Sequence, residues 1–184
     1  MINIRWLSPL DSNRTEIGRY SQILLPYLPR AFSLSAVTDA ATVHENFSPE
    51  NHVLGMEPIN IYNLGNSYMH CGIARLAMEQ PGVAILHDVS LLELGLAYAR
   101  IIPDWNLSEK VANEYGFHAA EAFNALYHGV ALEWCGESQQ QYDAFVTTFP
   151  VFETFVKNAY GIVVHSNYAL EKVKRKYKGP VLKL

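Results

Sequence analysis

The chain has 184 residues, of which 49% are hydrophobic and 17% are charged, which is enough for one domain with a buried core and excludes a disordered segment. Its net charge of −4 gives no reason to expect a nucleic acid as partner. Because we find no signal peptide and no run of about 18 apolar residues, we expect a cytoplasmic protein. Cys71 and Cys135 have neither metal-binding nor redox spacing, and we interpret Cys71 as a reduced core residue.

Four short apolar segments end at polar side chains, and each predicts a strand that is buried on both faces. They are Asn3–Leu7, Ile59–Leu64, Val83–Leu86 and Tyr160–His165. A further strand is predicted over Phe32–Val37, and residues 39–58 are predicted to be mainly loop. Parallel strands joined by helical crossovers bring their carboxyl ends to one edge of a sheet, where open α/β sheets bind their ligands. We therefore expect an α/β fold with a mainly parallel sheet and its chemistry at this edge.

Helical patterns occupy several of the intervening segments. Apolar side chains from Ile17 to Leu28 recur every three or four residues and predict a helix, which Asn13 would open together with Glu16. Ser67 is predicted to cap a helix from Tyr68 to about Gln80. A basic helix is predicted over Tyr168–Tyr177.

Residues 89–160 contain only helical patterns. One helix ends at Pro103, a second is capped by Ser108, can be interrupted by Gly116 and ends at Gly136, and Pro150 divides two more, Tyr142–Thr148 and Val151–Asn158. Roughly 70 residues of helix exceed a simple crossover, so we expect an inserted helical subdomain between the fourth and fifth strands, covering one side of the crevice. The last strand, Val181–Leu184, has no covering helix, and we expect the chain to be a fragment that ends where a second domain begins.

Several segments, in this order and spacing, resemble the N-terminal half of the family 4 glycosyltransferases, which have two Rossmann domains (GT-B type). The segment with Gly65-Asn66-Ser67 and His70, the segment ending in His87-Asp88, and the segment with His165-Ser166 carry this resemblance. The full stretches are Tyr62–His70, Pro81–Asp88, Gly161–Ala169, Leu7–Pro9 with Ile17–Ser21 and, weakly, Asn113–Gly116.

The resemblance implies that residues 1–184 form a Rossmann-like domain, the acceptor-side half of a nucleotide-sugar-dependent, retaining glycosyltransferase. Such an enzyme transfers a hexosyl group to a saccharide or lipid-linked acceptor. Its C-terminal domain, which would hold most of a UDP- or GDP-sugar, is absent from the chain, so we expect no cofactor bound by this domain alone and no turnover without the missing half. One departure is Glu16, which stands where relatives carry glycine and would repel a pyrophosphate.

The candidate site residues follow the predicted strands. His87 and Asp88 are the expected catalytic pair, because an imidazole and a carboxylate at a strand end can orient an acceptor hydroxyl. Helix capping by Asp88, and packing of His87 beneath it, is the alternative. Eight further residues are expected to bind substrate, with capping or solvation as the alternative for the polar ones: Arg14, Gly18, Gly65, Asn66, Ser67, His70, His165 and Ser166.

No metal is expected. Glu114, His118 and Glu121 share one face of a predicted helix, but the sequence offers no second set of ligands to face them. The basic helix either contacts an anionic membrane at its inner face or complements its own helix dipole. Its basic residues, with the one that follows it, are Lys172, Lys174, Arg175, Lys176 and Lys178.

Two other functions remain open. A non-catalytic binding or scaffold domain derived from such an enzyme is favoured by Glu16. A stand-alone hydrolase or phosphatase would use His87, Asp88 and His165. A second Rossmann domain encoded downstream would eliminate the hydrolase and weaken the scaffold hypothesis.

Overall fold

A computed structural model describes residues 2–11, 13–28, 32–37, 58–102, 104–128 and 138–184. The predictions for residues 39–57, Pro103, Cys135 and Gly136 fall outside these ranges. Within them, six strands form one all-parallel sheet in the order β2-β1-β3-β4-β5-β6, which confirms the expected α/β fold with a Rossmann-like parallel sheet. The strands are β1 (Ile2–Leu7), β2 (Phe32–Val37), β3 (Ile59–Leu64), β4 (Gly82–Leu86), β5 (Ala159–Val164) and β6 (Val181–Lys183).

The strand order reverses direction between β1 and β3. The chain passes from β1 outward to β2, returns to β3 on the other side of β1, and then continues outward to β6. Such a reversal is a topological switch point, and ligands of open α/β sheets bind outside the strand ends at that point. The register brings the ends level, because Leu64 pairs with Leu86 and Leu86 pairs with Val164.

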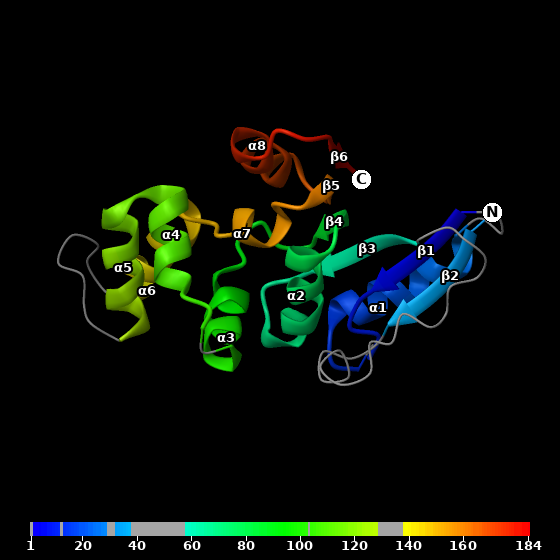
Figure 1. Ribbon diagram of the computed structural model, residues 1–184, viewed down its shortest axis with the longest axis horizontal. Coiled ribbons are helices and arrows are strands. Elements are labelled where there is room, and N and C mark those ends of the chain that lie inside the picture. The colour runs from blue at the N-terminus through cyan, green and yellow to red at the C-terminus, as the bar shows by residue number, and fades with distance from the viewer. Residues whose placement is uncertain (1, 12, 29–31, 38–57, 103, 129–137) are drawn as a thin grey trace.

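Helices join the strands, and five of the described helices, α3 to α7, separate β4 from β5. Figure 1 shows α4, α5 and α6 together at the end of the molecule opposite β1 and β2. The helices are α1 (Glu16–Leu24), η1 (Leu25–Tyr27), η3 (Tyr68–His70), α2 (Cys71–Glu79), α3 (Leu92–Ile101), α4 (Leu107–Tyr115), α5 (Phe117–Tyr127), α6 (Ser138–Thr148), α7 (Glu153–Val156) and α8 (Asn167–Lys176). Within the described ranges, none of them has the length and apolar character needed to cross a bilayer.

The two faces of the sheet are covered differently. Leu64, Leu86 and Val164 face the large core that α2, α3, α7 and α8 complete. On the opposite face, the Trp6 Nε1–H donates to Ser21 Oγ of α1 at 3.0 Å. Because successive side chains of a strand alternate between faces, the residues that follow the three buried ends point toward α1.

Cys71 lies in the main core, where burial raises the pKa of its thiol to about 11. A buried thiol of high pKa stays protonated and unreactive. The prediction of a reduced core cysteine is confirmed.

The start of α1 differs from the prediction. Thr15 is the N-cap, and its Oγ1 accepts the Gly18 N–H at 2.7 Å. Asn13 lies two residues too early, and its own N–H donates to Asp11 Oδ1 at 3.0 Å. An N-cap oxygen reaches N–H groups only two or three residues ahead, so Asn13 belongs to the preceding turn.

Two further helix starts show the same mechanism. Asn106, rather than the predicted Ser108, caps α4 by accepting the Glu109 N–H at 3.1 Å. Ser166 caps α8 by accepting the Ala169 N–H at 3.1 Å. The structure therefore shows Ser166 in the capping role that was the alternative to substrate binding.

The predicted helix from Ser108 onward is divided. Gly116 has φ +91°, a left-handed conformation that ends α4 before α5 begins. Pro150 does not open the next helix, because Val151 has φ +64° and its N–H donates to Tyr115 Oη at 2.8 Å. Helix α7 therefore begins only at Glu153 and is shorter than predicted.

Candidate functional site

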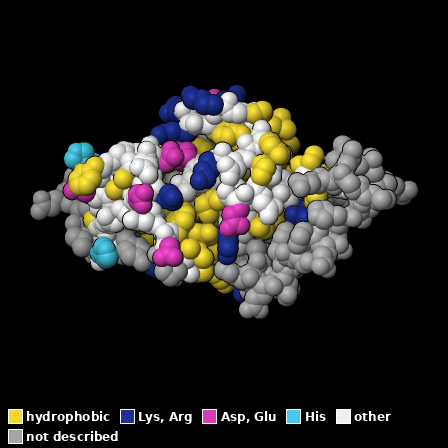
Figure 2. Space-filling model, in the orientation of Figure 1, with side chains coloured by type: hydrophobic (Ala, Val, Ile, Leu, Met, Phe, Trp, Pro, Cys, Tyr) yellow, Lys and Arg dark blue, Asp and Glu magenta, His cyan; other side chains and the backbone are white. Residues whose placement is uncertain are grey.

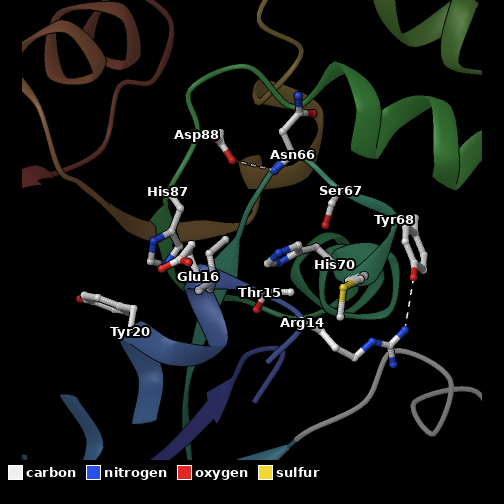
Figure 3. A pocket seen from close by; sticks show the side chains of 12 residues that line it. Arg14, Thr15, Glu16, Tyr20, Asn66, Ser67, Tyr68, His70, His87 and Asp88 are labelled. Carbon is white, nitrogen blue, oxygen red and sulfur yellow. Dashed lines mark hydrogen bonds between the residues drawn. The ribbon is translucent and has the colours of Figure 1, made fainter. Parts of the chain in front are cut away.

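A cavity of about 710 Å³ opens at the carboxyl ends of β1, β3 and β4, beside the switch point (Figure 3). Its volume lies in the range that small-molecule sites occupy. The loop and helix after β1, the loop after β3 and the end of β4 supply its walls. The lining residues are Arg14, Thr15, Glu16, Ile17, Tyr20, Asn66, Ser67, Tyr68, Met69, His70, His87 and Asp88.

His87 follows β4 and points to the α1 side of the sheet. Its Nε2 lies 3.0 Å from Asn63 Oδ1, and its ring centroid lies 5.0 Å from that of Tyr20, edge to face. Burial, together with the neighbouring His165 and His70, lowers the pKa of His87 to about 4. The imidazole is therefore neutral at pH 7 and has a ring nitrogen available to accept a proton or a hydrogen bond.

Asn63 is a site residue that the sequence analysis missed. It is completely buried in β3, and its Nδ2–H donates to the Leu7 carbonyl at 3.2 Å. Its side chain thus links β1, β3 and the residue after β4. The available signal was an asparagine inside a strand that the sequence predicts to be buried, since a buried amide needs specific partners.

His70 enters the cavity from η3, where Figure 3 shows its ring directed inward. Only 1% of the residue is exposed, and its Nδ1–H donates to the Asn63 main-chain carbonyl at 2.9 Å. Burial lowers the pKa of His70, so this imidazole is also neutral at pH 7. Both histidines that line the cavity therefore contact Asn63.

Asp88 is not hydrogen-bonded to His87. Its Oδ2 accepts the main-chain N–H of Asn66 at 2.9 Å, which ties the loop after β3 to the end of β4. The predicted His87–Asp88 pair thus lies in one cavity, but the histidine is oriented by Asn63 and the carboxylate holds the neighbouring loop. Asp88 does not cap the helix after β4, which was the alternative role expected for it.

Asn66 does cap a helix, although not the one that follows it. Its Oδ1 accepts the N–H groups of Glu93 at 2.8 Å and Leu94 at 3.2 Å, at the start of α3. Ser67, the predicted cap of the next helix, makes no side-chain capping bond there, because that helix begins with the 3₁₀ turn η3. Ser67 thus occupies the predicted N-cap position, where its main-chain oxygen accepts the His70 N–H at 3.1 Å, but its side chain makes no capping bond and lines the cavity wall.

Two glycines allow close packing around the cavity. A Cβ on Gly65 would lie 2.3 Å from Ile17 Cδ1 and 3.0 Å from His70 Nε2. A Cβ on Gly18 would lie 2.7 Å from the Asp11 carbonyl oxygen, and neither Gly65 nor Gly18 is itself a lining residue. Gly65 thus keeps space for the histidine, and Gly18 holds the loop after β1 against α1.

The charges at the rim come from Arg14, Glu16 and Asp88. Arg14 Nη2–H donates to Tyr68 Oη at 3.4 Å, and Tyr68 is 60% exposed. With both cavity histidines neutral, one cation stands against two carboxylates. This balance disfavours an anion, whereas acceptor groups beside aromatic rings suit a neutral ligand rich in hydroxyls.

His165 lies beside the cavity without lining it. Its ring centroid lies 4.9 Å from that of His87 and 5.5 Å from that of Tyr20, and the residue is exposed. His165 thus forms the side of the His87 environment that faces solvent.

No metal site is found: among the described residues, no three His, Cys, Asp or Glu side chains could hold an ion together. His118 Nδ1 pairs with Glu121 at 3.2 Å on the surface.

Figure 2 shows Lys and Arg side chains gathered over α8. Two lysines of α8 contact the helices that lie between β4 and β5. Lys172 Nζ donates to the Thr147 carbonyl at 3.1 Å, and Lys176 Nζ lies 4.7 Å from the Tyr115 ring centroid.

Comparison with known proteins gives no relative: no family model matches the chain, and neither the curated proteins nor the solved structures yield a match.

Proposed function

We propose that this domain is the acceptor-side half of a nucleotide-sugar-dependent, retaining glycosyltransferase that transfers a hexosyl group to a saccharide or lipid-linked acceptor. The observation that carries the proposal is the convergence of two neutral imidazoles, His70 and His87, with Asn66, Ser67 and Asp88 at the switch-point cavity. Such a site accepts hydrogen bonds from sugar hydroxyls. The resemblance of the sequence segments supplies the reaction class.

In the proposed reaction, the domain orients the attacking hydroxyl. A hydroxyl has a high pKa, and a positioned base lowers the cost of removing its proton. His87 is suited to this role because it is neutral and its Nδ1 has no hydrogen-bond partner among the described residues. Tyr20 and Tyr68 offer aromatic faces for a sugar ring.

Glu16 bears on where the donor binds. It lies in the first turn of α1 and lines the cavity, so a pyrophosphate there would meet a carboxylate. A UDP- or GDP-sugar is therefore proposed to be held by a separate C-terminal domain, with no cofactor bound here. The same residue favours the second candidate, a binding or scaffold domain that has lost the transfer activity.

The helices between β4 and β5 are proposed to form an inserted subdomain beside the acceptor. Asn66 supports this arrangement, since one residue of the cavity wall caps α3. A peripheral contact of α8 with the inner face of the membrane belongs to the same proposal. Its exposed cations are Lys174, Arg175, Lys176 and Lys178, and Lys172 is partly buried.

A binding experiment tests the proposal. The ¹⁵N-labelled domain is titrated separately with a neutral disaccharide such as maltose, with UDP-glucose and with inorganic phosphate. Saccharide-dependent shifts at Asn66, Ser67 and His70 are expected, with smaller effects from phosphate. If a panel of neutral saccharides shifts none of these signals, the acceptor-site proposal is wrong.

Activity separates the remaining candidates. In an enzyme that joins this domain to a donor-binding domain, His87→Ala is expected to abolish transfer. The fold is expected to survive because water in the cavity can reach Asn63, and thermal melting checks this. Hydrolysis of p-nitrophenyl acetate or p-nitrophenyl phosphate by the domain alone, lost in His87→Ala, would instead support the hydrolase.

A further inference from the structure

Asn63 uses both of its carbonyl oxygens to contact histidines. Its side-chain Oδ1 lies 3.0 Å from His87 Nε2, and its main-chain oxygen lies 2.9 Å from His70 Nδ1. Asn63 is completely buried, and His70 is 1% exposed. One residue of β3 therefore hydrogen-bonds both imidazoles that line the cavity, His87 through its side chain and His70 through its backbone.

The orientation of the Asn63 amide follows from its third contact. The side-chain nitrogen lies 3.2 Å from the Leu7 carbonyl, which can only accept a hydrogen bond. The nitrogen must therefore face Leu7, and the oxygen must face His87. An amide oxygen also only accepts, so His87 has to carry its proton on Nε2, and its Nδ1 is left bare.

The same reasoning gives the opposite tautomer for His70. The main-chain oxygen of Asn63 accepts from Nδ1, so the bare nitrogen of His70 is Nε2. This Nε2 has no partner among the described residues, and the side chain lines the cavity. Burial lowers the pKa of both histidines, which keeps a second proton off each ring at neutral pH.

We propose that Asn63 is a positioning residue that fixes His87 as the Nε2–H tautomer and His70 as the Nδ1–H tautomer, so that both rings present an unprotonated nitrogen to the cavity. The use of these two acceptors, to bind hydroxyl groups of a neutral saccharide, rests on the proposed function. The tautomers themselves do not depend on it.

This arrangement has a consequence for ligand choice. Two bare ring nitrogens and the Glu16 carboxylate all accept hydrogen bonds, so the matching ligand donates them. A polyol has several such donors, whereas the hydrogen phosphate dianion has only one, and its negative charge is repelled by the Glu16 carboxylate and the ring lone pairs. Asn63 thereby makes the cavity selective for hydroxyl donors without touching the ligand.

The test measures the tautomers directly in the ligand-free domain. The ¹⁵N shifts of the ring nitrogens, read through long-range ¹H–¹⁵N correlations, distinguish protonated from bare positions. In the wild type at pH 7 we expect His87 protonated on Nε2 and His70 on Nδ1. The opposite tautomer at His87, or a mixture there, would overturn the proposal.

Asn63→Ala removes the contact to His87 and leaves the main-chain contact to His70. We therefore expect His87 to become a mixture of tautomers while His70 keeps its proton on Nδ1. Asn60→Ala is the matched control, because Asn60 is also buried in β3 but contacts Arg5, Gln80 and the Pro81 carbonyl instead. It should leave both histidines unchanged. An unchanged His87 in Asn63→Ala, or the same change in both variants, contradicts the proposal.

Asn63→Asp gives a second measurement if the alanine variant does not fold. An aspartate keeps an oxygen facing His87, so the Nε2–H is expected to persist. Its carboxylate also favours the imidazolium, so the pKa of His87 is expected to rise above the wild-type value of about 4. Loss of the Nε2–H signal in this variant would overturn the proposal. Correct tautomers without saccharide binding would refute the proposed function alone.

Discussion

The Asp88 carboxylate accepts the main-chain N–H of Asn66 at 2.9 Å, and this contact joins the loop after β3 to the end of β4. In Asp88→Ala the Asn66 amide loses its acceptor, and we expect its hydrogen exchange to accelerate and the free energy of unfolding to fall by about 1–2 kcal/mol. Asp88→Asn keeps an acceptor oxygen and should show a smaller change. Equal exchange rates at Asn66 in Asp88→Ala and the wild type would show that the contact is not formed in solution.

Asn66 in turn caps α3 through its side chain, and its replacement should be costlier than that of its neighbour. Asn66→Ala leaves the N–H groups of Glu93 and Leu94 without their acceptor, and loss of a cap costs about 1 kcal/mol. Ser67→Ala is the matched control, since Ser67 makes no capping bond. Urea unfolding of both variants checks the difference, and an equal loss in the two would contradict this assignment.

The strands were predictable because their signal is local. An apolar run that stops at polar residues needs no knowledge of the rest of the chain, so β3 was predicted at its observed bounds and β4 to within one residue. Helix starts were less accurate, since several polar residues near a start can cap it. Thr15 and Asn106 replaced candidates two residues away.

The hydrogen bonds that connect the residues of the site were not predictable from the sequence. Asn66 caps a helix that begins about two dozen residues later, and Asn63 bonds partners from β1 and from the end of β4. Such contacts depend on the strand order and register, which the sequence does not display. Reasoning from parallel strands indicated which loops would meet, but not which side chain would orient His87.

Acid should weaken the fold through His87. Its pKa is about 4 in the folded chain and about 6.5 when unfolded, so the unfolded state binds protons more readily between these values. Stability contributed by the neutral ring is complete above pH 6.5 and is lost as the pH falls toward 4. After allowance for solvent screening at this half-buried site, the free energy of unfolding falls by about 2 kcal/mol over this pH interval.

His87→Gln cannot titrate, so its unfolding free energy should fall less than that of the wild type over this interval. Carboxylates titrate in both proteins, and the difference between the two pH profiles therefore isolates the histidine. His70 has a lowered pKa as well and adds a dependence of the same sign to both curves. Parallel profiles for variant and wild type would show that His87 is not buried as a neutral ring.

Gly18→Ala sets helix propensity against packing. Alanine in place of glycine within a helix gains about 1 kcal/mol from propensity alone. Here the new Cβ would lie 2.7 Å from the Asp11 carbonyl oxygen and 2.9 Å from that of Pro9, both backbone atoms, so the loop after β1 must move. Because overpacking costs about 1–3 kcal/mol, and more when backbone has to shift, we expect a net destabilisation of about 2 kcal/mol in urea unfolding.

Gly65→Ala is the informative comparison, since its new Cβ meets a side-chain tip. The nearest atom is Ile17 Cδ1 at 2.3 Å, and this group can rotate or be removed. We expect a loss of about 1 kcal/mol, which Ile17→Val should partly restore in the double variant because valine lacks the Cδ1 atom. The Gly18 variant should gain nothing from Ile17→Val. If Gly18→Ala instead stabilises the domain, the gain in helix propensity exceeds the steric cost of the new Cβ. The loop after β1 is then not packed against α1 as closely as in the structure.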